Sequence, residues 1–185
     1  MALKEILTEP NKLLRAKSLA VEKVDEDLQK LMDDMLETMY AAPGIGLAAI
    51  QVGVPKRVIV LDIGWRNKLE SIDDEKQVVR KNPMYFVNPE IITKSTNNST
   101  YEEGCLSVPG QFAEIERPDK CHIKYLDYYG IQKEIKAEGM LATCIQHEMD
   151  HLEGILFIDY LSKLKKSMIV KKLTKQKEQL DRIVI

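Results

Sequence analysis

The segment QHEMDH at residues 146–151 is the most informative stretch of this chain, because residues 147–151 fit the pattern H-E-x-x-H. At about 3.6 residues per turn of α-helix, His147 and His151 lie one above the other on one face, and Glu148 points about 100° away. The two imidazoles can therefore bind one metal ion, while the carboxylate stays free to move protons on water. The alternative is a surface helix that carries two histidines by chance. We favour a catalytic metal site on a central helix.

A third ligand is needed, because a catalytic zinc site uses three protein ligands and keeps one position open. In the long zinc-protease pattern, H-E-x-x-H-x-x-G-x-x-H, this chain has Phe157 in place of the last histidine. The other common zinc proteases take a glutamate from a downstream helix. Here Glu153 is too close, and Glu178 and Asp181 lie in a lysine-rich tail. We therefore expect the third ligand upstream of the helix.

The chain has three cysteines, and two of them suit other roles. Cys144 shares the histidine face, but the helix between it and His151 spans about 10 Å. Metal bonds of about 2.0–2.3 Å cannot bridge that distance, so Cys144 is expected to pack beneath the site as a small buried group. Cys121 begins an alternating stretch, residues 121–126, which predicts a half-buried position on a strand.

Cys105 is the predicted third ligand. It lies in EEGCLSVPG at residues 102–110, where Gly104 and Pro109 indicate irregular backbone. Such backbone can present both a thiol and free amide groups to a ligand.

Three blocks of sequence resemble the signature motifs of the bacterial-type peptide deformylases and occur in the same order. They are GIGLAAIQ at residues 44–51, EGCLS at residues 103–107 and QHEMDH at residues 146–151. The resemblance extends over about residues 3–165. It implies a metal-dependent hydrolase that removes the N-formyl group from the initiator methionine of nascent polypeptides and releases formate.

The resemblance implies a metal held by one cysteine and two histidines. These residues are Cys105, His147 and His151. The family uses ferrous iron in many members, so Fe(2+) is the expected ion, and zinc, nickel or cobalt can substitute for it. The sulfur ligand suits such soft or borderline ions.

The chemistry can be built from the implied residues. A divalent metal lowers the pKa of water toward neutrality and makes a hydroxide-like nucleophile available at about pH 7. Glu148 is the expected acid/base, which takes a proton as the oxygen attacks the formyl carbon and returns it to the departing amine. The side-chain amide of Gln51 and the backbone N–H of Leu106 are expected to donate to the developing oxyanion.

The resemblance also implies contacts with the substrate. The methionine side chain is expected in an apolar pocket beside the metal helix, and the glycines of the first motif allow an extended peptide to approach the backbone. The residues predicted to bind substrate are Ile45, Gly46, Gly104, Arg117, Leu141 and Cys144. The alternatives are that Leu141 is plain core and that Arg117 is a solvated strand residue. Thr143 departs from the family pattern, in which an aliphatic residue is usual.

The length and composition fit one domain over residues 1–185. The chain has 44% hydrophobic residues, which can form a core, and its net charge of -2 argues against a DNA-binding or membrane-binding protein. The amino terminus lacks an apolar signal, and no segment approaches the roughly 20 apolar residues needed to cross a bilayer. An odd number of cysteines without a secretory signal points to a reducing cytoplasm.

The order of elements predicts an α+β fold, with mixed or antiparallel sheets packed around the metal helix. An amphipathic helix is expected after residues 25–27, from leucines and methionines at helical spacing, and it must end near Pro43. Gly139 is expected to open the metal helix. The strands are predicted at residues 57–62, 84–92, 121–128 and 131–138, the last two joined as a hairpin at Gly130. The polar residues 64–82 predict a surface loop without a catalytic role.

A basic helix is predicted at the carboxyl end, at about residues 161–183, because lysines dominate there and Leu161, Leu164, Met168 and Leu173 form a partial apolar stripe. The simplest explanation of this composition is a solvated helix that docks along one edge of the protein. As a hypothesis, its positive face contacts ribosomal RNA.

Two rival functions remain. A general peptidase would use the same helix, although Phe157 counts against it. A metal-stabilised fold without activity would need four closed protein ligands, for which His122 and two other cysteines are available, and would have no need for Glu148.

Overall fold

The computed structural model describes residues 2–64 and 81–183. Its helices are α1 (Glu26–Ala41), α3 (Gly139–Leu152) and α4 (Lys163–Ile183), with 3-10 turns η1 (Lys12–Arg15), η2 (Ala49–Val52) and η3 (Phe157–Tyr160). Its strands are β1 (Gly46–Ala48), β2 (Val58–Leu61), β3 (Met84–Lys94), β4 (Asn98–Cys105), β5 (Val108–Pro118), β6 (Lys120–Leu126) and β7 (Gln132–Glu138). The fold is therefore α+β, as predicted.

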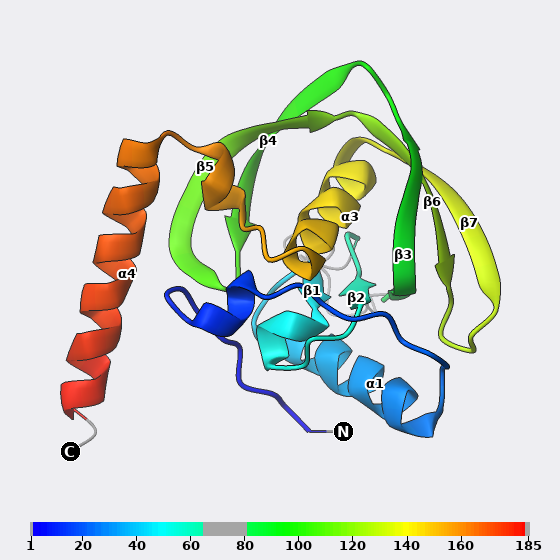
Figure 1. The fold of residues 1–185 in the computed structure, drawn as a ribbon, viewed down its shortest axis with the longest axis horizontal. Helices are drawn as coiled ribbons and strands as arrows, with labels where there is room; N and C mark the ends of the chain where they lie inside the picture. The colour runs from blue at the N-terminus through cyan, green and yellow to red at the C-terminus, as the bar shows by residue number, and fades with distance from the viewer. Residues whose placement is uncertain (1, 65–80, 184–185) are drawn as a thin grey trace, which may run out of the picture.

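The strands form two antiparallel sheets around α3. One has five strands in the order β1-β2-β3-β6-β7, and the other is the β4–β5 pair. Figure 1 shows α3 in the middle, with β4 and β5 on one side and β3, β6 and β7 on the other. Helix α1 lies below them, and α4 stands at the edge of the molecule beside β5.

Helix α1 begins and packs as its sequence predicts. The side chain of Asp25 accepts a hydrogen bond from the N–H of Leu28 at 3.0 Å, which caps the first turn. Met32, Met35 and Met39 recur at helical spacing and are fully buried against β1 and β2. This methionine stripe is therefore core, and it fixes the strand that carries the first glycine motif.

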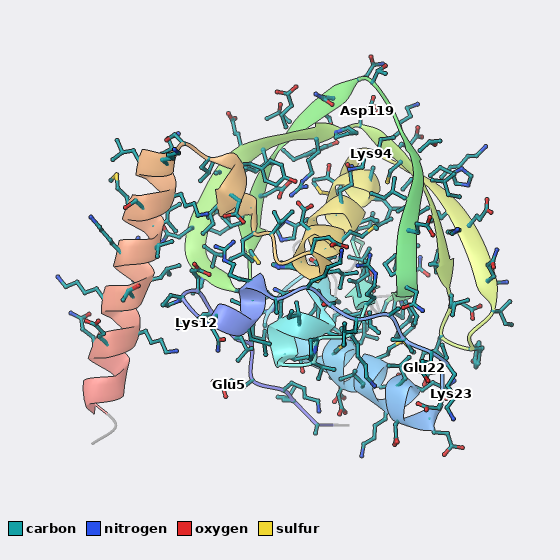
Figure 2. All side chains as sticks on the ribbon, viewed as in Figure 1. Glu5, Lys12, Glu22, Lys23, Lys94 and Asp119 are labelled. Atoms are coloured by element: carbon teal, nitrogen blue, oxygen red, sulfur yellow. The ribbon has the colours of Figure 1, made fainter. Side chains whose placement is uncertain are left out.

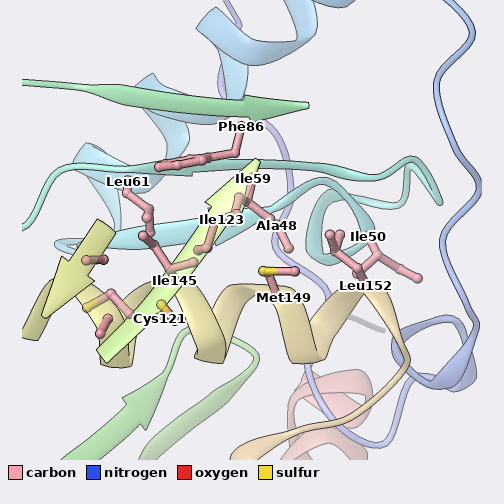
Figure 3. Close-up of a cluster of buried hydrophobic side chains, with 13 residues drawn as sticks. Ala48, Ile50, Ile59, Leu61, Phe86, Cys121, Ile123, Ile145, Met149 and Leu152 are labelled. Atoms are coloured by element: carbon pink, nitrogen blue, oxygen red, sulfur yellow. The ribbon is translucent and has the colours of Figure 1, made fainter. Parts of the chain in front are cut away.

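Helix α3 is buried along most of its length, from Ala142 to Met149. One face carries Ile145, Met149 and Leu152, which pack against the inner side of the five-stranded sheet, including Phe86 (Figure 3). Because this face is covered by the sheet, the histidines on the other face are held rigidly toward β4 and β5.

The predicted strands and the hairpin at Gly130 are confirmed, but three strands were missed. These are β1, β4 and β5. The prediction of irregular backbone around Cys105 is confirmed in part, because residues 106 and 107 form a turn directly after Cys105, whereas Pro109 lies within strand β5. The pairing register shifts only between Gly104 and Cys105, where the hairpin turns. That shift presents the cysteine and the following amides.

Charged side chains cover the outside of the molecule, as Glu22, Lys23 and Lys94 illustrate in Figure 2. Most of the predicted 64–82 loop, residues 65–80, lies outside the described residues. The helices that the structure does describe include none that is long and apolar enough to cross a membrane.

Helix α4 begins two residues later than predicted, at Lys163. Leu173 is buried, and Ile169 and Val170 pack beside it against β5 and η3. In contrast, Leu164 and Met168 are 72% and 63% exposed. The helix therefore docks by one edge, and part of its apolar surface remains open.

Candidate metal centre

The structure brings the three predicted ligands together. Cys105 ends β4, and His147 and His151 lie on α3. The Sγ of Cys105 is 3.2 Å from the Nε2 of His151, and one donor atom from each of the three residues lies within 4.8 Å of the others. Cys105 is half-buried, His147 is 8% exposed and His151 is fully buried.

The residues fit a divalent metal ion by their chemistry. The Nδ1 of His147 lies 2.7 Å from the Oε2 of Glu103, an arrangement that fixes the ring and leaves Nε2 free to bind a metal. A sulfur and two imidazole nitrogens form a donor set that suits soft or borderline ions. No fourth protein ligand accompanies them in the described residues, as a catalytic rather than a structural site requires.

Glu103 belongs to a buried ion-pair network behind the three clustered donors. Arg117 donates to both oxygens of Glu103 and, at 2.7 Å, to Asp150. The hydroxyl of Tyr160 donates to Asp150 at 2.8 Å, and its ring lies under the guanidinium. Burial opposes ionisation of Glu103, but His147 and Arg117 outweigh it, so the pKa of this carboxyl is lowered. Glu103 is therefore an anion that holds His147.

The location of Arg117 differs from the sequence prediction. Only 3% of Arg117 is exposed, and it does not line the cavity that opens onto Cys105 and His147. It lies neither on a solvated surface nor at a peptide-binding mouth, because its guanidinium is used by Glu103 and Asp150. Sequence reasoning assigned no role to Glu103, although it stands beside the third ligand in the second motif.

Glu148 lies next to the ligands and is only 5% exposed. Its Oε2 has no hydrogen-bond partner in the described part of the chain. Burial raises the pKa of Glu148 to about 7, the range in which a carboxyl both accepts and releases protons at neutral pH. Gly46 leaves the room that this side chain needs, because a Cβ at that position would collide with the Oε1 of Glu148.

Gln51 is held in one orientation. The N–H of Ala48 donates to its Oε1 at 2.8 Å, so its Nε2 must face the site, where it lies 3.1 Å from the Oγ of Ser107 and 3.6 Å from the Sγ of Cys105. Leu106 follows Cys105 in the hairpin turn and lines the same cavity. Gln51 and Leu106 thus both line the cavity beside the three clustered donors.

A cavity of about 570 Å³ opens onto these groups. Of the predicted substrate-binding residues, those that line it are Ile45, Gly46, Gly104 and Cys144. Leu141 does not line the cavity. It packs against the core, which is the alternative that the sequence left open. Burial raises the pKa of Cys144 to about 12, which keeps it a neutral wall residue.

The cavity wall also contains residues that sequence reasoning missed. Met140 lies two helical turns before His147 and could have been found from this spacing. Phe112 lines the mouth because it pairs with Gly104 across the hairpin, a register that the sequence does not reveal. Thr143, where the family pattern has an aliphatic residue, is also in the wall.

The α+β fold, the Cys-His-His donor set and the buried glutamate beside an open cavity define a metallohydrolase of the H-E-x-x-H class. A family model described as polypeptide deformylase matches residues 3–167. A curated peptide deformylase from Pelagibacter ubique is 64% identical over 185 residues, which cover 100% of both chains. The chain therefore belongs to the polypeptide deformylase family. It is an enzyme that removes the N-formyl group from formyl-methionyl peptides.

Solved structures agree with this assignment. The crystal structure of peptide deformylase from Ehrlichia chaffeensis has a TM-score of 0.86 and 45% identity, covering 97% of this chain and 99% of that chain. A second structure of that protein, in complex with actinonin, has a TM-score of 0.84 and 44% identity, covering 95% and 98%.

Proposed function

We propose that Cys105, His147 and His151 hold the catalytic ion, that this ion is Fe(2+), and that zinc, nickel or cobalt can replace it. The observation that carries the proposal is the meeting of these three donors beside the buried Glu148. When bound, such an ion polarises a carbonyl and supplies a water of lowered pKa. The two other cysteines are not among the clustered donors: Cys121 is buried in the core, and Cys144 is a buried residue of the cavity wall.

Glu148 moves the proton in this proposal. It accepts a proton from the attacking water as the new C–O bond forms at the formyl carbon, and it donates that proton to the nitrogen as the C–N bond breaks. Formate and a free amino terminus result. The raised pKa of Glu148, caused mainly by burial, supports both transfers at neutral pH.

Gln51 and Leu106 stabilise the oxyanion. The Nε2 of Gln51 is directed to the site because Ala48 holds its oxygen, so this donor is already oriented before substrate binds. The backbone N–H of Leu106 is the second donor. Loss of one donor in such a site raises the barrier by about 2.7–4 kcal/mol.

The methionine side chain binds in the cavity. Ile45 and Cys144 provide apolar wall, and Gly46 and Gly104 line the same cavity, where β1 and β4 lie beside the path of the peptide backbone. The solved deformylase of Ehrlichia chaffeensis binds actinonin, and we expect actinonin to occupy the same cavity here.

We also propose a single domain over residues 1–185, a cytoplasmic location and a contact between the basic α4 and the ribosome. The lysines of α4 support that contact, since phosphate binding depends on such charges. Sedimentation with ribosomes should weaken as salt rises and be lost when residues after Leu164 are removed. Sedimentation that neither change affects would reject the contact.

The test is to purify the enzyme without oxygen, quantify its bound metals, and measure formate from formyl-methionyl peptides. Deformylase activity should release formate from formylated peptides and leave unformylated peptides uncleaved. Cleavage of internal bonds would support the peptidase, and bound metal without turnover would support the inactive metal-stabilised fold. Activity that falls in air, with loss of iron, supports Fe(2+).

A further inference from the structure

We propose that a groove between β5 and α4 binds the part of the polypeptide substrate that follows the formyl-methionine. The groove has a volume of about 760 Å³, and its walls include Phe112, Glu114, Lys165, Met168, Ile169 and Lys172. The inference rests on the proposed function, because it gives the active-site cavity an extension along the same chain of substrate.

The groove is continuous with the active-site cavity. Gln111 and Phe112 line both spaces. The ring of Phe112 covers the place where a Cβ on Gly104 would lie, at 2.5 Å, yet 67% of the residue is exposed. A peptide that leaves the cavity past Gly104 therefore meets this aromatic ring and, beyond it, the groove.

One wall of the groove is an extended strand. Residues 111–114 of β5 lie there, and β5 pairs only with β4 among the strands that the structure describes. A free strand edge can bind an extended peptide through its backbone, without regard to the side chains of that peptide. This suits an enzyme whose substrates share only their first residue.

The opposite wall comes from α4 and is apolar with basic edges. Met168 is 63% exposed, although it lies beside the partly buried Ile169. A methionine side chain is flexible and polarizable, so it adapts to different partners. Lys165 and Lys172 outnumber Glu114 among the charged residues of the groove, which favours apolar and acidic residues in the bound peptide.

The experiment compares kcat/KM for formyl-methionyl peptides of about three and about nine residues, the longer being about 30 Å when extended. The longer carries apolar and acidic residues in its second half. We expect the longer peptide to react about tenfold better, through a lower KM, in the absence of ribosomes. Met168→Glu should abolish this advantage and leave the short peptide unchanged.

A matched control lies one turn away on the same helix. Leu164 is 72% exposed and does not line the groove, so Leu164→Glu should keep the advantage of the longer peptide. Lys172→Glu should reduce it most for acidic peptides. Equal kcat/KM for both peptides in the unaltered enzyme, or equal losses in Met168→Glu and Leu164→Glu, would overturn the proposal. Failure of the proposed function looks different, since the short peptide would then release no formate.

Discussion

The Nδ1 of His147 lies 2.7 Å from the Oε2 of Glu103, so a proposed metal ligand on α3 is oriented by a carboxylate on β4. Arg117 binds both oxygens of the same carboxylate from β5. The helix that supplies the histidines and the hairpin that supplies the cysteine are thereby tied together at the site itself.

Replacing the carboxylate should therefore weaken metal binding. We expect Glu103→Gln to raise the metal dissociation constant about 10–100-fold, because the orienting anion is lost. The free energy of unfolding should also fall, since Arg117 loses one of its buried partners. Competition with a chelator measures the first effect and urea denaturation the second. Glu116→Gln, an exposed glutamate on β5, is the control. Unchanged metal affinity in Glu103→Gln would contradict this role.

Removing the carboxylate of Glu148 should separate metal binding from turnover. We expect Glu148→Ala and Glu148→Gln to retain the metal, because Glu148 is not one of the three clustered donors. Formate release should fall by a factor of about 10²–10⁴ with the loss of general acid/base catalysis. The metal content and the rate are measured on the same samples. Normal turnover by either variant would refute Glu148 as the proton carrier.

The buried hydroxyl of Thr143 should make the folded protein less stable than a methyl group at the same place would. Its Oγ1 has no hydrogen-bond partner among the described residues, so Thr143→Val should raise the free energy of unfolding by about 1 kcal/mol. Thr38, which is buried to the same 3%, donates to the carbonyl of Asp34 and accepts from the N–H of Lys4. Thr38→Val should lower the free energy of unfolding by about 1–3 kcal/mol. Urea denaturation compares them, and similar losses in both variants would reject the prediction.

Acid should weaken the attachment between the amino-terminal segment, η3 and α4, because all three meet at Asp159. Burial opposes ionisation of Asp159, but Lys166, the N–H of Leu156 and Arg15 outweigh it and lower its pKa from 3.8. A carboxyl whose pKa is lower in the folded state stabilises that state above its unfolded pKa, and this contribution is lost as the pH falls through the folded pKa.

We therefore expect Asp159→Asn to be less stable than the unaltered protein at about pH 7 and the difference to shrink below about pH 4. Urea denaturation of the metal-free proteins across this range measures it. Asp119→Asn is a control, because Asp119 lies at the β5–β6 turn and makes no contact with Arg15, Leu156 or Lys166 among the hydrogen bonds and ion pairs of the described residues. A difference that stays constant from neutral to acid pH would contradict the role of the ionised form.

The sequence by itself determined the features that depend on near neighbours in the chain. The spacing of His147 and His151 fixes their common face on a helix, and Asp25 with the methionines after it defines α1 and its buried side. Gly130, with a φ of 78°, permits the turn of the β6–β7 hairpin. Helical and strand periodicity are local properties, so they can be read from residue order.

Tertiary structure alone decided which distant residues meet. Cys105 reaches His151 across 46 residues because the β4–β5 hairpin brings it there, and the same hairpin buries Arg117 against Glu103 instead of exposing it to peptide. Phe112 and Met168 likewise share a groove only because α4 docks along β5. Such contacts depend on the packing and register of whole elements, and no local pattern in the sequence encodes them.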